Sequence, residues 1–364
     1  MKVLHIVEAF GGGIYTYMEA LLKQMSDEFE IVVAYALRPQ TPDDFKEHFN
    51  NKIKFIEVKH FQRSINPIND LFAGFEIRDI VKSEKPDLIH LHSSKAGVLG
   101  RLFLNCKRNA VFYTPHGYAF MKKDDSVIKR NMYFMIEWLM GRCHSVTVGC
   151  SKGEYAAAKK VSKKAIWINN GIDYITLPAC GELGGTERLL IATIGRVCYQ
   201  KNPRMFNKVA LSMPEADFLW VGEGDMEDEL TAPNIKITGW KSREETLELL
   251  NKADVFLLLS LWEGLPISLL EAMCLKKVCV VSDVIGNRDV IINRKNGYVV
   301  NDEEECVTVL KEIAHSLGEQ SMIVESAHQS VVEKYNISVM GEMYAREYRK
   351  LCSRCDGKYS RSRI

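Results

Sequence analysis

The most informative stretch of this chain is Ala253-Asp-Val-Phe-Leu-Leu-Leu-Ser-Leu-Trp-Glu-Gly-Leu-Pro-Ile-Ser-Leu-Leu-Glu-Ala-Met273. It predicts an apolar strand over Val255–Leu259, a short loop, and an apolar helix that opens at Pro266, a favoured first helical position. A strand–loop–helix junction in an α/β sheet offers backbone N–H groups and the positive end of a helix dipole. The junction therefore predicts a site for an anionic ligand.

Two carboxylates bracket this junction. Glu263 lies in the predicted loop and Glu271 in the predicted helix, with seven residues between them. Acids beside a phosphate site make sense if they accept hydrogen bonds from hydroxyl groups that flank the phosphates. Glu271 also lies among apolar neighbours, where an unpaired carboxylate is costly. A ribose on one side and a sugar on the other would supply the hydroxyls, which indicates a nucleotide-sugar site.

This pattern resembles the double-glutamate motif of retaining glycosyltransferases with the two-domain GT-B fold, in family four (glycosyl transferases group 1). Other segments resemble family elements in the family's order: Asp87–His92, Thr114–Gly117, Ile168–Asp173, Ile194–Asn202, Trp220–Asp225, Ile237–Gly239 and Ser282–Ile291. Two departures are Glu223, where Asp is usual, and Asp289, where Glu is commoner. The resemblance covers nearly the whole chain, from Met1 to about Tyr348.

The resemblance implies a role for each polar site residue. Arg196 and Lys201 hold the donor diphosphate, as a forked guanidinium and a compact ammonium can. Glu271 binds the ribose, whereas Glu263 contacts the donor sugar and is not assigned as a covalent nucleophile. His116 points toward that sugar. Retention follows from front-face attack, in which the leaving diphosphate takes the acceptor proton and the fixed cations stabilise charge.

Backbone groups complete the expected binding site. The Gly-rich turn after the first strand is not a G-x-G-x-x-G motif, because position 16 is Thr. It is either simple turn geometry or a lid over the diphosphate and acceptor. Residues expected to bind through their backbone are Gly12, Gly13, Gly239, Gly264, Leu265 and Ile267.

Two further histidines lie on the predicted strand Leu88–His92. We expect only one of them to face the cleft, because side chains alternate along a strand. His92 is nearer the C-terminal end, where α/β proteins bind ligands, so it is the better candidate and His90 is expected to pack in the core.

The apolar stretch Val127–Met140 allows two interpretations. Lys122, Lys123, Lys129 and Arg130 surround its start, which is typical of a helix on a membrane surface. Its aromatic and Met content also fits a helix buried against the sheet, and Glu137 matches an acid of the family there. The core helix is the favoured interpretation.

Composition describes an ordinary globular protein, with 46% hydrophobic and 26% charged residues in 364. No apolar run reaches the roughly 18–20 residues that span a bilayer. The start Met1–Val7 indicates a first strand instead of a signal peptide, so we expect a cytoplasmic protein. There is no Asp-X-Asp motif, and Cys352–Cys355 is a lone C-x-x-C pair, so we expect no metal; the nucleotide sugar is a substrate and no cofactor is expected.

The charge is uneven along the chain. Residues 1–172 hold 25 Lys and Arg against 18 Asp and Glu, a net +7, whereas the remainder carries −6. The basic half fits either a solvated surface or contact with an anionic partner, such as a lipid-linked phosphate or the inner face of the membrane. From the family we expect a saccharide or undecaprenyl-diphosphate-linked acceptor, and no nucleic acid.

Alternating strands and helices predict an α/β protein with two Rossmann-like, doubly wound domains, which in the GT-B fold face a central cleft. We expect an acceptor-side domain over 1–175, a Gly-rich linker over 176–187, and a donor-binding domain over 188–335. A helix at about 338–351 is expected to pack back on the first domain. Two alternatives share this fold: a non-hydrolysing sugar-nucleotide epimerase and a catalytically inactive relative that binds sugar nucleotides.

Overall fold

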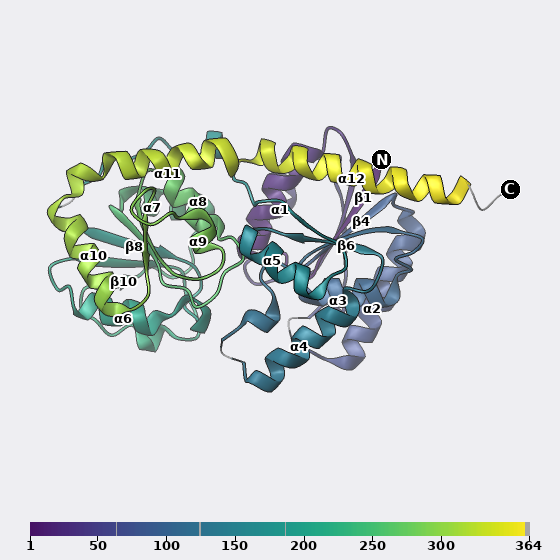
Figure 1. Cartoon of the computed structure of the whole chain (residues 1–364), viewed down its shortest axis with the longest axis horizontal. Coiled ribbons are helices and arrows are strands. Elements are labelled where there is room, and N and C mark those ends of the chain that lie inside the picture. Colours follow the sequence, from purple (N-terminus) through teal and green to yellow (C-terminus); the bar gives the residue numbers. More distant parts are fainter. Residues whose placement is uncertain (63, 124, 186, 361–364) are drawn as a thin grey trace. The chain divides into compact units, whose positions relative to one another are not determined.

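The computed structural model describes residues 1–62, 64–123, 125–185 and 187–360, with side chains up to Ser353. Its contacts divide the chain into two compact units (Figure 1). The first unit contains Met1–Met121, Ser126–Gly171 and the chain from Ile337 onward. The second contains Ile172–Asn336 and a short segment that begins at Lys122.

The first unit is built on a seven-stranded parallel sheet in the order β3-β2-β1-β4-β5-β6-β7. The strands are β1 (Lys2–Val7), β2 (Glu30–Tyr35), β3 (Lys54–Glu57), β4 (Leu88–His92), β5 (Ala110–Thr114), β6 (Ser145–Gly149) and β7 (Ala165–Trp167). The strands β1, β2, β4, β5 and β6 are buried along their whole length or all but one residue of it, because helices cover both faces of a parallel sheet.

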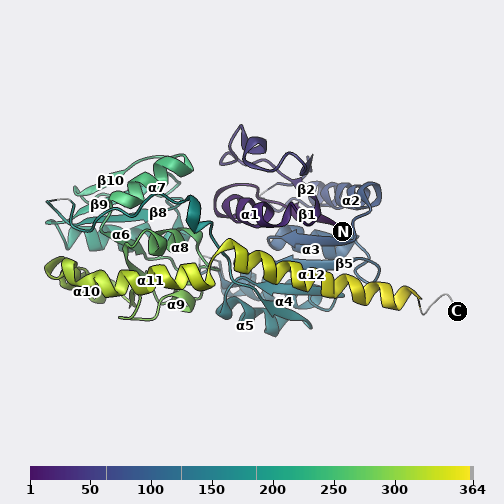
Figure 2. The same ribbon diagram turned by 90° about the horizontal axis from the view of Figure 1, so that it is seen from above.

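Two helices cover one face of this sheet and four cover the other (Figures 1 and 2). The first face carries α1 (Gly12–Met25) and α12 (Ile337–Ser360). The opposite face carries α2 (Pro67–Glu84), α3 (Ser94–Phe103), α4 (Val127–Met140) and α5 (Lys152–Val161). The hydroxyls of Tyr17 and Tyr344 are 2.8 Å apart, so α12 is tied to α1 by a buried hydrogen bond as well as by apolar packing.

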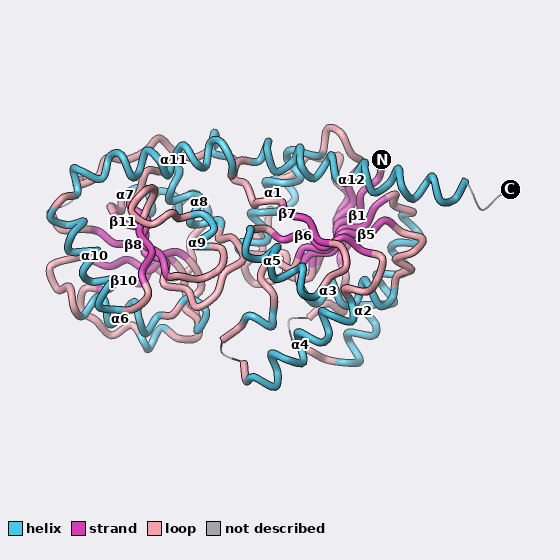
Figure 3. The backbone as a smooth tube through the Cα atoms, in the orientation of Figure 1, coloured by secondary structure: helices cyan, strands magenta, loops and turns pink. Residues whose placement is uncertain are grey.

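The second unit has a six-stranded parallel sheet in the order β10-β9-β8-β11-β12-β13, seen as its own group of strands in Figure 3. The strands are β8 (Leu190–Ile194), β9 (Asp217–Val221), β10 (Ile235–Ile237), β11 (Val255–Leu258), β12 (Val278–Ser282) and β13 (Tyr298–Val300). Strand order reverses at β8 and β11, which is where doubly wound sheets bind ligands.

Helices cover both faces of this second sheet as well. The larger core lies beneath α6 (Pro203–Leu211) and α10 (Glu303–His315). The other helices are α7 (Arg243–Lys252), α8 (Ile267–Cys274), the short α9 (Asn287–Val290) and α11 (Ser321–Lys334). Short 3-10 helices are η1 (Phe45–His48), η2 (Ala119–Met121), η3 (Tyr174–Thr176), η4 (Tyr199–Lys201), η5 (Glu227–Glu229) and η6 (Leu317–Gln320).

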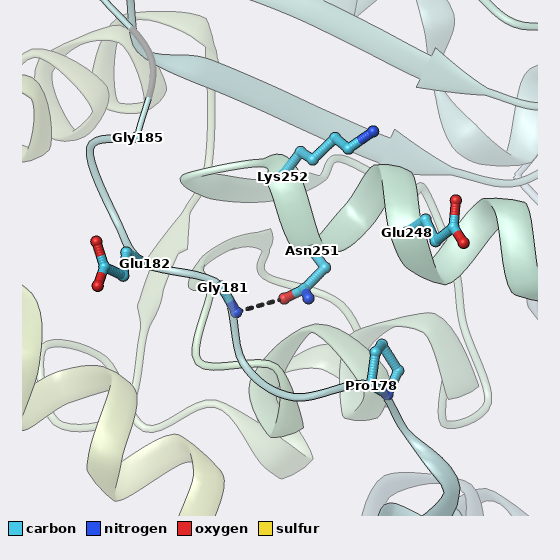
Figure 4. A pocket seen from close by; sticks show the side chains of 7 residues that line it. All are labelled: Pro178, Gly181, Glu182, Gly185, Glu248, Asn251 and Lys252. Atoms are coloured by element: carbon cyan, nitrogen blue, oxygen red, sulfur yellow. Dashed lines mark hydrogen bonds between the residues drawn. The ribbon is translucent and has the colours of Figure 1, made fainter.

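The Gly-rich segment expected as a linker is held against the second unit. The Asn251 side chain accepts a hydrogen bond from the Gly181 N–H and donates one to the Ala179 carbonyl, each 2.7 Å long. The Gly184 N–H donates to Asp254 at 2.7 Å. An open hollow of about 500 Å³ remains between this segment and α7 (Figure 4). It is lined by none of the residues that the sequence assigned to a site.

The predicted α/β class with two doubly wound sheets is confirmed. One boundary was wrong: Pro266 is the N-cap of α8 with an extended backbone, and the helix begins at Ile267. Proline fixes φ alone and leaves ψ free, so it fits the position before the first turn as well as inside it.

The interpretation of Val127–Met140 as a core helix was wrong for the outer side of the helix. Glu137 is buried on the inner side of α4, but Ile128 is 84% exposed and Met135 52% exposed. The composition did not distinguish the two sides, because apolar residues occupy both of them.

Candidate functional site

A glycine in the loop after β8 lies directly against the Lys201 side chain. Gly195 has φ +137°, and a Cβ at this position would lie 2.9 Å from the Lys201 Cε atom. This backbone angle favours glycine, and a side chain here would displace the end of the lysine side chain. Asn202 follows in the left-handed region and precedes Pro203, the first residue of α6.

Lys201 meets Glu263, which comes from the loop after β11. The Lys201 Nζ atom lies 2.7 Å from the Glu263 Oε1 atom, and the two side chains are only 16% and 9% exposed. Gln200 joins the loops: its carbonyl accepts from the Leu261 N–H at 2.8 Å and its side chain donates to the Trp262 carbonyl at 3.0 Å. Because β8 and β11 pair directly, the ends of adjacent strands bring the two charges together.

Arg196 is exposed on the same loop. The Val197 N–H donates to the Glu223 carbonyl at 2.9 Å, and the Trp220 indole N–H donates to the Gly195 carbonyl at 2.8 Å. The loop is therefore braced on both sides of the arginine. Within the described residues we find no hydrogen bond or ion pair for the Arg196 side chain, which leaves its guanidinium available to an anion.

Glu271 lies on α8 and is 5% exposed. Its carboxylate pairs with Arg243, the first residue of α7, with 2.6 Å between Oε1 and Nη1. The sequence argument required a partner for this buried acid and named only the ribose, so Arg243 was missed. The Ser242–Glu245 capping box marks the start of α7 in the sequence, but nothing in it shows that this helix end meets α8.

The backbone positions of the expected site lie around these side chains. Gly239 has φ +72° and forms an isolated bridge with Gly222. Gly264 is packed tightly, since a Cβ on Gly286 would lie 2.5 Å from its carbonyl oxygen. Leu265 is buried, and Ile267 opens α8, whose N-terminus has no side-chain cap. That helix end is suited to an anionic ligand.

In the first unit, His116 follows β5 in a constrained turn. Its φ is +53°, an uncommon value for a residue other than glycine. The buried carboxylate of Glu154 holds this turn, accepting from the Gly117 N–H at 2.6 Å and from the Cys150 N–H at 2.7 Å. Sequence reasoning did not identify Glu154, although an acid in the first turn of a helix that follows a strand was a usable signal. The expected position of His116 toward the donor sugar stays a prediction.

Gly12 and Gly13 lie at the start of α1 in the same unit. Gly12 has φ +54°, which favours glycine, while a Cβ on either residue would meet nothing within 4 Å. Gly11 is the N-cap residue, so no side chain caps the start of this helix. The turn therefore leaves open space beside its backbone, and its role as a lid stays a prediction.

His116 ends a chain of hydrogen-bonded histidines. Its Nε2 atom lies 3.1 Å from Nδ1 of His92, whose Nε2 atom lies 3.0 Å from Nδ1 of His5 on β1. The argument that the side chains of His90 and His92 alternate was wrong, whereas the expectation that His90 packs in the core is confirmed, since it is fully buried. Residues two apart in a strand share a face, and these two rings lie 3.9 Å apart between centroids.

His90 belongs to a second branch of this network. Its ring nitrogens contact Thr114 Oγ1 at 2.8 Å and the Tyr348 hydroxyl of α12. Ring nitrogens of His5, His90 and His92 lie within 4.8 Å of one another, as in a metal site. Five of the six ring nitrogens already have hydrogen-bond partners, so the neutral network accounts for this cluster.

Burial makes these histidines neutral. It lowers the pKa of His5 and His116 to about 3, and that of His90 and His92 well below its ordinary value. A neutral imidazole carries one N–H. The Nε2 atom of His5 is buried without a hydrogen-bond partner among the described residues, and an orphaned buried N–H is rare. We therefore place the His5 proton on Nδ1, so that each ring donates from Nδ1 and His116 keeps its own Nδ1 proton.

Two family models match the chain. Residues 11–174 match the model described as Glycosyltransferase Family 4, and residues 183–329 match Glycosyl transferases group 1. Together these matches take in most of the sequence. The chain belongs to the family 4, group 1 glycosyltransferases. The resemblance seen in the sequence is thereby confirmed.

Curated relatives of this glycosyltransferase include two bacterial enzymes. The UDP-Gal:alpha-D-GlcNAc-diphosphoundecaprenol alpha-1,3-galactosyltransferase of Escherichia coli is 27% identical over 329 residues, 80% of this chain and 82% of the relative. The N,N'-diacetylbacillosaminyl-diphospho-undecaprenol alpha-1,3-N-acetylgalactosaminyltransferase of Campylobacter jejuni is 22% identical over 79% of this chain and 82% of that enzyme.

Solved structures confirm the GT-B fold of the glycosyltransferase. Sucrose-phosphate synthase from Thermosynechococcus elongatus gives a TM-score of 0.81 at 15% identity, covering 97% of this chain and 100% of that one. HepE of Anabaena, solved with UDP and glucose, gives 0.77 at 15% identity over 95% of this chain and 99% of that one. At these identities the likeness concerns the fold alone.

The histidine chain leads to a prediction about the glycosyltransferase without substrate. In ¹⁵N NMR spectra of histidine-labelled protein, His116 should show a protonated Nδ1 and a bare Nε2 at neutral pH. In His92→Leu this preference should be lost, because Nε2 of His116 no longer has a donor, whereas His315→Leu on the exposed end of α10 should leave it unchanged. A wild-type spectrum with the proton on Nε2 would contradict the assignment.

Proposed function

We propose that this glycosyltransferase moves a sugar from a nucleotide-sugar donor, a UDP-sugar in the first instance, to a saccharide linked to undecaprenyl diphosphate, with retention of anomeric configuration. Its setting would be the synthesis of a bacterial surface polysaccharide. The names of the Escherichia coli and Campylobacter jejuni relatives support a diphosphoundecaprenol-linked acceptor, and the first also supports a UDP donor.

One observation carries the proposal: the buried pair of Lys201 and Glu263 at adjacent strand ends. A diphosphate needs a fixed cation, and the sugar attached to it needs a hydrogen-bond acceptor. The pair supplies both within one contact. The uncapped N-terminus of α8 lies next in sequence and favours further negative charge.

In the proposed reaction, the bond between the anomeric carbon and the diphosphate oxygen breaks, and the acceptor hydroxyl oxygen bonds to that carbon on the same face. The acceptor proton goes to the departing diphosphate. Arg196 and Lys201 stabilise the negative charge that grows on the leaving group. Glu263 accepts hydrogen bonds from sugar hydroxyls, and the positioning of the reactants supplies the rest of the acceleration.

Glu271 is proposed to bind the ribose. Arg243 holds its carboxylate through one oxygen, Oε1, at 2.6 Å. A ribose with two adjacent hydroxyls can use the remaining acceptor capacity. Arg243 is thus a positioning residue, because it orients the acid and offsets the cost of burying its charge.

Fixed cations in this proposal take the place of a divalent metal, and we expect transfer without one. The assay mixes the protein with a UDP-sugar in excess EDTA, with and without a lipid-linked saccharide acceptor. Free UDP should appear only when acceptor is present, and the product should keep the anomeric configuration of the donor.

Three results would overturn parts of this proposal. Isomerised donor without acceptor would identify an epimerase, and donor binding without turnover would identify an inactive relative. Activity that disappears in EDTA and returns with Mg²⁺ would contradict the fixed-cation mechanism. GDP-sugars in a parallel thermal-shift series test the choice of base, since a bound ligand raises the apparent stability.

Arg196→Ala and Lys201→Ala should each lower kcat by about 10²-fold or more, the scale of losing one charge-stabilising group. Lys208→Ala, an exposed cation on nearby α6, is the matched control and should keep wild-type rates. Steady-state kinetics with saturating donor measure the effect. Near-normal rates in either site variant would remove that residue from the diphosphate site.

The two glutamates should separate by role. Glu271→Gln should weaken the binding of free UDP, because the ribose is present in UDP itself. Glu263→Gln should change the UDP Kd little, because its amide oxygen can still accept a hydrogen bond from Lys201. It should lower kcat/KM for the intact donor by an amount equivalent to about 1.5–3 kcal/mol, the range of charged hydrogen bonds. Calorimetry with UDP and initial rates with donor distinguish them. Equal loss of UDP affinity in both variants would contradict the assignment.

A further inference from the structure

The outer side of α4 is an apolar surface. Five large side chains along this side are between 36% and 84% exposed: Ile128, Met132, Met135, Trp138 and Leu139. They follow the spacing of one helix face. We call these five residues the α4 face. The inner side of the helix is anchored separately, where Glu137 pairs with Arg101 at 2.9 Å and accepts from the Tyr113 hydroxyl at 2.7 Å.

Exposed apolar side chains also occur on neighbouring helices. Of the 21 large hydrophobic residues that are exposed in the described chain, 12 lie between Ile65 and Leu139. Four of them occupy the start of α2: Ile68, Leu71, Phe72 and Phe75. Helix α3 packs against both α2 and α4, and the two views show the three helices side by side (Figures 1 and 2). Single exposed apolar residues are ordinary, but a concentration of this kind marks an interaction surface.

Positive charge borders the α4 face. Lys129 and Arg130 lie in the first turn of the helix, and Arg142 lies just beyond its end. The Arg142 guanidinium stacks 3.2 Å from the centre of the Trp138 ring. Glu137, the one acidic residue of α4, is buried and faces inward, so the outer side carries no carboxylate from this helix. Apolar and aromatic side chains with a cationic border are the pattern of a helix that lies in a bilayer interface.

We propose that the α4 face docks on an anionic lipid bilayer. The cations would meet lipid phosphates while the five apolar side chains enter the region below the headgroups. A second copy of the chain is a poorer occupant, because a symmetric contact over this face would bring the same cationic borders together. No helix in the described part of the chain is long and apolar enough to cross a membrane, so docking would be peripheral.

This inference does not rest on the proposed reaction, since binding to lipid requires no substrate. The full chain is floated with vesicles of phosphatidylcholine alone or with one-third phosphatidylglycerol. Wild-type protein should float with the anionic vesicles, and raised salt should weaken the binding by screening. Met132→Asp/Met135→Asp should lower the partition coefficient at least about tenfold, since two charges enter the apolar face.

Two further variants make the test specific. Met322→Asp is the matched control, because Met322 is 82% exposed on α11 of the second unit, and it should bind like the wild type. Lys129→Glu/Arg142→Glu keeps the apolar face and should reduce binding to the anionic vesicles. Thermal unfolding curves verify that each variant is folded.

Failure of wild-type protein to bind the anionic vesicles would overturn the proposal, and so would an equal loss in Met322→Asp. A wild-type dimer that the α4 variants convert to monomers, without any vesicle binding, would assign the face to a second copy instead. Sedimentation velocity supplies that measurement.

Discussion

A buried carboxylate must have a partner, and this requirement organises both units of the protein. Four buried glutamates each have either a cation or two hydrogen-bond donors as partners. The pairings are Glu137 with Arg101 and Tyr113, Glu154 with two backbone N–H groups, Glu263 with Lys201, and Glu271 with Arg243. Apart from the contact of Glu154 with the Cys150 N–H, these pairings join elements that are distant in sequence. Removing one member would leave the other buried and uncompensated, which costs more than the intact contact contributes.

In the second unit the same requirement would prepare the proposed donor site before any ligand arrives. Glu263 holds the Lys201 ammonium in place, so the long lysine side chain has already lost much of its rotamer freedom. A phosphate that reaches this ammonium would find it already oriented. Arg243 likewise holds the Glu271 carboxylate through a hydrogen bond. Donor binding would then exchange partners within an existing network instead of ordering a loop.

Local patterns in the sequence predicted most of the fold. Alternating apolar strands and helices identified both sheets. Contacts between distant elements were not accessible, because spacing along one segment does not show what packs against it. Arg243 and Glu154 were missed for this reason, as each acts through a partner from another element. The α4 helix was misjudged because apolar residues line both its sides, and only the packing shows which side is covered.

The return of α12 to the first sheet also sets the order in which the units can be completed during synthesis. The second unit is almost continuous in the chain, so nearly all of its residues have left the ribosome before α12 is made. The first unit lacks Tyr344 and Tyr348 until then, and the hydrogen bonds they make to Tyr17 and His90 cannot form. One apolar face of its sheet stays partly uncovered while about half the protein is translated. The nascent first unit is thus the part of this chain that most needs protection from aggregation, until α12 covers the exposed face of its sheet.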